Sequence, residues 1–284
     1  DTWTGDFRSA PAESATSVKF LAYGDTRGND SDPPDDHDDV AREMLNLFAS
    51  DPEYQTFTLH VGDWVDDGDS ESQWQSHFFN RSFYHVLQMQ SRLAINGCMG
   101  NHEDGSSTLF DKYYPYPYVD SYYWSFDYGP VHVAVLDQYE TSYSSGSSQI
   151  DWLENDLADT DKEWKVLLFH EPAYSAGGHS NDGTSQDVFQ PICEQYGVDL
   201  VICGHNHYYA RCVKNGVQHI TTGGGGARLY SYDSGASYLE TASKTYHFCK
   251  ISIDGGWLDF QAIDTSGSVI DEFTLNDPSF VNVS

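Results

Sequence analysis

The sequence predicts an α/β fold in one large domain. Up to about residue 210, short segments rich in apolar residues alternate with segments of helical periodicity. Beyond that point strand and turn signals dominate, and Gly255-Gly256 and Gly267 mark hairpins. With 284 residues, of which 39% are hydrophobic, the chain is long enough to bury a substantial core.

Residues 1–16 are expected to form a strand followed by a linker, because DTWTGDF precedes small residues and Pro11. The domain itself is expected over residues 17–284. Its first strand, SVKFLAYGD, is apolar and ends in Gly24-Asp25. A second strand, YQTFTLHVGD, alternates apolar side chains and ends in Gly62-Asp63. Further strands are expected within residues 91–103, 121–138, 163–172 and 198–210.

Three helices are predicted between these strands. In residues 37–50 the apolar side chains recur at the three- and four-residue spacing of one helical face, as they do in residues 148–159. Residues 185–197 are also expected to be helical, with Pro191 shortening or kinking the helix.

The composition limits the classes of partner. The net charge is −30, from 44 acidic and 14 basic residues, and a field of that sign repels nucleic acid and anionic membranes. The chain has no run of 18 uncharged apolar residues, so no membrane span is expected. None of its five cysteines forms a CxxC pair, which argues against a structural zinc knuckle.

Polar side chains follow five of the predicted strands at the point where each strand ends. They are Asp25, Asp63 with Asp66, Asn101 with His102, His170, and His205 with His207. Because the carboxyl ends of strands in an α/β sheet meet at one edge, these side chains are expected to converge. A single aspartate at a strand end is more often a turn or cap residue, but five strand ends with Asp, Asn or His indicate one shared site.

The residue types indicate a metal site. Carboxylate, amide and imidazole donors suit zinc, manganese, iron, nickel or cobalt, and no thiolate is needed. Three histidines, two aspartates and one asparagine exceed the needs of one tetrahedral ion, so two ions that share a carboxylate are expected. Two ions roughly 3.5–4 Å apart support in-line displacement at phosphorus.

The ordered motifs resemble the calcineurin-like metallophosphoesterase superfamily, and within it the purple acid phosphatases and their bacterial relatives. The resemblance spans about residues 17–270 and rests on GD (24–25), GDWVDDG (62–68), GNHE (100–103), FH (169–170) and GHNH (204–207). It implies a four-layer α-β-β-α sandwich with two central mixed sheets. Residues 17–284 would then be the catalytic domain.

The resemblance also implies a dinuclear centre. The first ion would bind Asp25, Asp63 and His207, and Asp63 would bridge to a second ion that also binds Asn101, His170 and His205. The ions would activate a hydroxide that attacks phosphorus.

Two further histidines receive roles by the same resemblance. His102 would contact the phosphoryl group or protonate the leaving oxygen. His179, nine residues after His170, lies at the offset of a histidine that contacts the substrate in purple acid phosphatases. The alternative for His179 is a loop histidine in a stretch of glycine and serine.

The chain departs from the family pattern at two positions. Asp66 stands where purple acid phosphatases have a tyrosine ligand, and Arg27 stands where most other members have a histidine ligand. His37 is the candidate for the missing ligand, because a helix N-terminus disfavours imidazolium and keeps the ring neutral. A solvated histidine among aspartates is the alternative, and Asp66 is a second candidate. Arg27 would bind phosphate oxygens or form a salt bridge to the acidic loop at residues 29–40.

These observations favour a phosphatase that hydrolyses small phosphomonoesters. Phosphodiester hydrolysis is the alternative within the class, and a non-catalytic metal-binding module is the alternative from another class. The start of the chain, DTWTGDFRSAP, resembles the end of the fibronectin-like domain of plant purple acid phosphatases, which implies a secreted or periplasmic protein.

Overall fold

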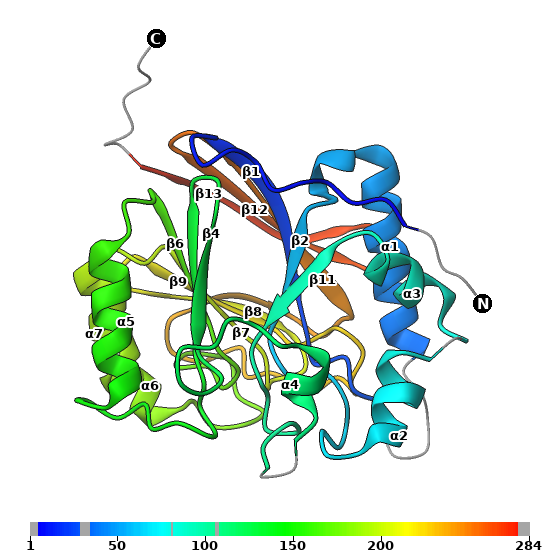
Figure 1. Cartoon of the computed structure of the whole chain (residues 1–284), viewed down its shortest axis with the longest axis horizontal. Helices are drawn as coiled ribbons and strands as arrows, with labels where there is room; N and C mark the ends of the chain where they lie inside the picture. The colour runs from blue at the N-terminus through cyan, green and yellow to red at the C-terminus, as the bar shows by residue number, and fades with distance from the viewer. Residues whose placement is uncertain (1–4, 29–34, 81, 106–107, 278–284) are drawn as a thin grey trace.

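Two mixed β-sheets form the centre of the protein in the computed structural model, which describes residues 5–28, 35–80, 82–105 and 108–277 (Figure 1). The first sheet has the strand order β13-β12-β11-β1-β2-β3 and the second has β10-β8-β9-β7-β6-β5-β4. In the first sheet β1, β2 and β3 are parallel, and β11 joins β1 antiparallel. In the second, β5, β6, β7 and β9 are parallel.

The strands have the following bounds. The first sheet comprises β1 (Ser17–Tyr23), β2 (Phe57–His60), β3 (Ala94–Gly97), β11 (His247–Asp254), β12 (Trp257–Asp264) and β13 (Val269–Asn276). The second comprises β4 (Trp124–Tyr128), β5 (Val131–Val135), β6 (Trp164–Leu168), β7 (Leu200–Cys203), β8 (Tyr209–Lys214), β9 (Val217–Thr222) and β10 (Leu239–Ser243).

Strand β1 shows how alternation builds two cores. Val18, Phe20 and Ala22 point between the sheets into the largest apolar cluster, where Phe20 stacks on Phe57 at a ring distance of 4.9 Å. Leu21 and Tyr23 point the other way, toward helices. Because both faces of the strand are buried over residues 20–23, that part of the sequence is a continuous apolar run.

Helices cover the outer face of each sheet. Helices α1 (Asp35–Ser50) and α3 (Tyr84–Gln90) pack on the first sheet, and α5 (Ser148–Asp159) and α7 (Phe189–Tyr196) pack on the second (Figure 1). The predicted four-layer α-β-β-α sandwich is thereby confirmed. The remaining short helical segments are η1 (Pro52–Tyr54), α2 (Glu71–Gln73), η2 (Trp74–Phe78), α4 (Phe110–Tyr113) and α6 (Gly183–Asp187).

The expected helix at 185–197 is divided. Helix α6 ends at Asp187 and α7 begins at Phe189, so Pro191 lies in the first turn of α7, where its missing N–H costs no helical hydrogen bond. The predicted hairpin turns are confirmed: β11 and β12 pair around Gly255-Gly256, and β12 and β13 pair around Gly267.

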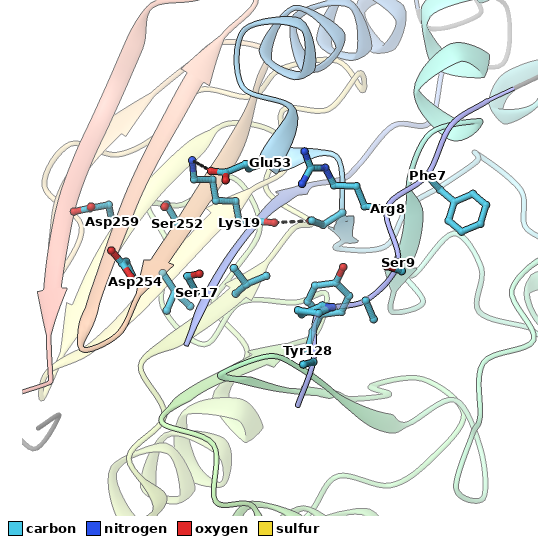
Figure 2. Close-up of a pocket in the computed structure, with 16 residues that line it drawn as sticks. Phe7, Arg8, Ser9, Ser17, Lys19, Glu53, Tyr128, Ser252, Asp254 and Asp259 are labelled. Carbon is cyan, nitrogen blue, oxygen red and sulfur yellow. Dashed lines mark hydrogen bonds and ion pairs between the residues drawn. The ribbon is translucent and has the colours of Figure 1, made fainter. Parts of the chain in front are cut away.

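The strand predicted near the N-terminus is not formed by residues 5–16, and residues 1–4 lie outside the described part of the chain. Strand β1 already pairs with β11 on one edge and β2 on the other, so it offers no free edge there. Instead the segment passes beside the start of β1 and helps to line a cavity of about 1140 Å³ (Figure 2). Lys19 forms an ion pair with Glu53 at 2.7 Å on this cavity wall.

The five cysteines are free and buried. Among the described residues no helix has the length and apolar character needed to cross a membrane.

Candidate metal centre

The loops after the parallel strands of both sheets meet at one edge, and three of their residues adopt a backbone that is unusual outside glycine. Asp25, Asp63 and His205 have φ angles of 54°, 54° and 65°. Such conformations cost of order 1–3 kcal/mol each and concentrate at functional sites. Gly62 precedes Asp63 at φ 92°, and a Cβ there would lie 2.7 Å from Nδ1 of His170.

The first donor group consists of Asp25, Asp63 and His207. One potential ligand atom of each lies within 4.8 Å of the others, and all three residues are buried. Nδ1 of His207 donates to the carbonyl oxygen of Arg228 at 2.9 Å, so Nε2 faces the carboxylates, 3.4 Å from Oδ1 of Asp25. A backbone acceptor of this kind orients an imidazole for metal binding.

The second donor group consists of Asn101, His170 and His205. Oδ1 of Asn101 lies 3.2 Å from Nε2 of His170 and 2.9 Å from Nδ1 of His205. Nε2 of His170 is also 3.3 Å from Oδ1 of Asp63, which therefore lies between the two groups. The structure thus brings together the six residues that the resemblance assigns to the two ions.

The donor chemistry of these residues fits metal ions. Nδ1 of His170 donates to the carbonyl oxygen of Val61 at 2.6 Å, so in the neutral ring Nε2 carries only a lone pair. That lone pair faces two acceptor oxygens, on Asp63 and Asn101. Acceptors that face one another repel unless a cation or a proton lies between them. Coordination of a cation would remove this repulsion.

Glu103 supports the site from behind, a role that the sequence reasoning missed although it noted the GNHE motif. The side chain is fully buried and accepts four backbone hydrogen bonds of 2.9–3.2 Å, from Asp63, Trp64, Val65 and Gly100. Burial, with the nearby charge of Asp63, raises the pKa of Glu103 to about 8, while the N–H donors favour its charged form. Glu103 thereby holds the loops after β2 and β3 together.

Arg27 contacts two aspartates of the loop after β2. Its Nε lies 3.2 Å from Oδ2 of Asp63, and its Nη1 lies 2.6 Å from Oδ1 of Asp66. Burial opposes the charge of Arg27, but Asp63, Asp25 and Asp66 outweigh it and raise the pKa of the guanidinium. This pairing was not predicted from the sequence. The predicted salt bridge to the acidic loop stays a prediction, because residues 29–34 lie outside the described residues.

His102 lies beside the same carboxylates. Its Nδ1 donates to the backbone oxygen of Asp66 at 2.6 Å, and its Nε2 is 3.8 Å from Oδ2 of Asp63. Asp66, the second candidate for the missing ligand, is paired with Arg27 and is not part of the first donor group.

His179 is exposed beside the second donor group. Its ring lies 4.1 Å from that of His205, and its backbone N–H donates to Oδ1 of Asn206 at 2.7 Å. Burial of the ring and the nearby His207 lower the pKa of His179, which favours the neutral imidazole. The position is compatible with contact to a substrate.

His37 is not brought to the donor groups. It is fully buried in α1 between the rings of Tyr23 and Phe78, each 5.7 Å away, and its Nε2 is 3.4 Å from the hydroxyl of Tyr23. Burial lowers the pKa of His37 to about 3, so the ring is neutral. The alternative of a solvated histidine is wrong, because this side chain has no exposed surface.

Comparison with known proteins agrees with this geometry. The family model for calcineurin-like phosphoesterases matches residues 18–209. Purple acid phosphatase 18 of Arabidopsis thaliana is 35% identical over 219 residues, covering 68% of this chain and 46% of that protein. Probable inactive purple acid phosphatase 1 of the same plant is 26% identical over 325 residues, covering 95% of this chain and 52% of that protein. The chain therefore spans about half the length of these relatives.

A solved structure supports the same fold. A purple acid phosphatase from yellow lupin (Lupinus luteus) seeds superposes with a TM-score of 0.79 at 18% identity, covering 98% of this chain and 59% of that one. The fold, the strand-end donors and the family match agree with one another. The chain belongs to the calcineurin-like phosphoesterase family and is purple acid phosphatase-like.

Proposed function

We propose that the protein is a dinuclear metal-dependent phosphatase that hydrolyses phosphomonoesters. The observation that supports this most strongly is the position of Asp63 between two groups of donors whose imidazole lone pairs face oxygen acceptors. The first ion would be held by Asp25, Asp63 and His207, and the second by Asp63, Asn101, His170 and His205. When bound, such ions polarise phosphoryl oxygens and lower the pKa of water.

The surrounding residues of the chain have separate tasks in this proposal. His102 has its Nδ1–H engaged with the backbone oxygen of Asp66, so its Nε2 faces the site, and the imidazolium form would give the Nε2 proton to the leaving oxygen. Arg27 directs N–H donors at Asp63, Asp66 and the hydroxyl of Tyr230, and its remaining donors would bind a phosphoryl oxygen. His179 would contact the substrate from the exposed side.

The test is hydrolysis after loading with manganese, zinc, iron or nickel. We expect p-nitrophenyl phosphate to be hydrolysed faster than bis(p-nitrophenyl) phosphate, and metal analysis to find two ions per chain. Faster hydrolysis of the diester would instead establish a phosphodiesterase.

A second candidate is a non-catalytic metal-binding module. Arg27 already neutralises part of the charge on Asp63, and one relative that aligns with 95% of the chain is named as probably inactive. Stoichiometric metal binding without hydrolysis of either ester, for any of the four metals, would support this alternative.

A further inference from the structure

A cavity of about 540 Å³ opens beside the candidate metal centre, lined by Gly178, His179, Arg228, Leu229, Tyr230, Ser231 and Lys244. Two of these lining side chains contact predicted metal ligands directly. The Tyr230 ring stacks on His207 at 4.1 Å and 17°, and the His179 ring lies 4.1 Å from that of His205. A single aromatic ring therefore separates the cavity from each donor group: Tyr230 from the first and His179 from the second.

Two cations line the cavity, and in the described parts of the chain neither forms an ion pair with a carboxylate. Arg228 is exposed, and within the described parts of the chain its guanidinium has no hydrogen bond or ion pair. Lys244 reaches only a hydroxyl, Oγ of Ser231, at 3.4 Å. Several other cations pair with acids, for example Arg211 with Asp271 at 2.7 Å. With 44 acidic and 14 basic residues, basic side chains are scarce in this chain, and this cavity has two of them.

We propose that this cavity binds an anionic group on the leaving-group side of the substrate. The inference rests on the proposed phosphatase function and specifies its substrate class: phosphomonoesters that carry a second anion, either a carboxylate or another phosphate. A guanidinium and an ammonium bind either group, while the Tyr230 ring forms an apolar wall against which the body of a leaving group packs. Since the protein as a whole repels anions, local cations decide which anionic substrates bind.

The test compares two matched esters, 4-carboxyphenyl phosphate and 4-carbamoylphenyl phosphate, which differ in charge but little in shape. We expect the metal-loaded protein to favour the carboxylate by about tenfold in kcat/KM, the value for two partly exposed ion pairs. The double variant R228A/K244A should lose this preference. The backbone oxygen of Arg228 that receives the His207 hydrogen bond is retained in the variant.

The control variant is Lys250→Ala, which removes one positive charge on β11, where the amine lies 5.6 Å from the Tyr54 ring and away from this cavity. Lys250→Ala should keep the preference for the carboxylate ester. In the unaltered protein, added salt should weaken this preference. An equal preference in the double variant and the unaltered protein overturns the subsite.

Failure of the subsite and failure of the phosphatase proposal are separable. If neither ester is hydrolysed, the phosphatase proposal fails, and calorimetry then gives the dissociation constants of the two intact esters. If the unaltered protein binds the carboxylate ester more tightly and the double variant does not, this would support the subsite even without hydrolysis. Equal dissociation constants in the unaltered protein would overturn it.

Discussion

The two sheets supply different kinds of donor to the candidate metal centre. Loops after the first sheet provide the oxygen donors Asp25, Asp63 and Asn101, and loops after the second provide the nitrogen donors His170, His205 and His207. The oxygen side has a cation of its own, Arg27, paired with Asp63. On the nitrogen side, backbone carbonyls orient the rings of His170 and His207.

The loops behind each side are also held differently. On the oxygen side a buried carboxylate, Glu103, accepts four backbone N–H groups. On the nitrogen side a neutral amide, Gln138, accepts the N–H groups of His170 and Glu171 at 3.1 and 2.7 Å and donates to the Glu171 oxygen. The oxygen side thus depends on balanced charge, and the nitrogen side on hydrogen-bond direction.

The largest effect is expected where the two sides join. Asp63→Asn keeps the shape of the side chain but removes the charge that both donor groups share. We expect kcat/KM to fall by at least about 10³-fold, which corresponds to about 4 kcal/mol. Metal analysis should find fewer than two ions per chain. Asp199→Asn, which changes a partly buried carboxylate directly before β7, is the control. Full metal content at the original rate in Asp63→Asn would show that Asp63 does not bridge.

The next largest effect is expected at Glu103, whose side-chain oxygens accept backbone N–H groups on the oxygen side. Glu103→Gln replaces one carboxylate oxygen by an NH₂ group that faces backbone donors. We expect a loss of about 2–4 kcal/mol in the free energy of unfolding, a decrease of very roughly 5–15 °C in Tm. Glu272→Gln, on the exposed strand β13, should change Tm little. An unaltered Tm in Glu103→Gln would mean that the second acceptor oxygen of Glu103 does not stabilise these loops.

The sequence predicted that these six strand-end side chains converge because its signal is local: each donor follows an apolar strand, and the carboxyl ends of such strands meet at one edge. The seventh candidate, His37, was wrongly expected there, because its burial beneath the aromatic rings is not visible in the sequence. Glu103 and Gln138 were missed as supports, because their partners are backbone N–H groups of loops that sequence patterns do not place. The partners of Arg27 were equally inaccessible, since Asp66 lies 39 positions away in another loop. The absence of a strand over residues 5–16 could not be predicted, because a local pattern does not show that both edges of β1 are occupied.

A smaller effect tests whether Arg27 supplies positive charge that bound metal would otherwise supply, rather than serving only to contact the substrate. In metal-free protein Arg27→Ala leaves Asp63 and Asp66 without their ion pair, and we expect a loss of about 2 kcal/mol in the free energy of unfolding. Bound metal would supply the missing positive charge, so the loss should be smaller in loaded protein. Thermal unfolding with and without a chelator measures both values. Equal losses in the two states would indicate that the metals and Arg27 act independently.

The smallest effect concerns a histidine of the second sheet that pairs with acids rather than with backbone carbonyls. His132 on β5 is buried, with Nδ1 2.8 Å from Asp127 and Nε2 2.9 Å from Asp156 of α5. Burial lowers its pKa, but the two hydrogen-bonded carboxylates outweigh burial and raise the pKa above the ordinary value. Its charged form therefore stabilises the folded state fully below about pH 6.5, and this contribution is lost as pH rises through the raised pKa.

The variant His132→Gln should therefore be less stable than the unaltered protein by a margin that depends on pH. We expect a margin larger by about 1 kcal/mol at about pH 6 than at about pH 9, measured by urea unfolding. A margin that does not change with pH would mean that His132 is neutral in the folded protein. The expected result would show that a buried histidine of this sheet stays charged when carboxylates receive both of its N–H groups. Where a carbonyl takes Nδ1–H, as at His170 and His207, Nε2 is left free to bind a metal.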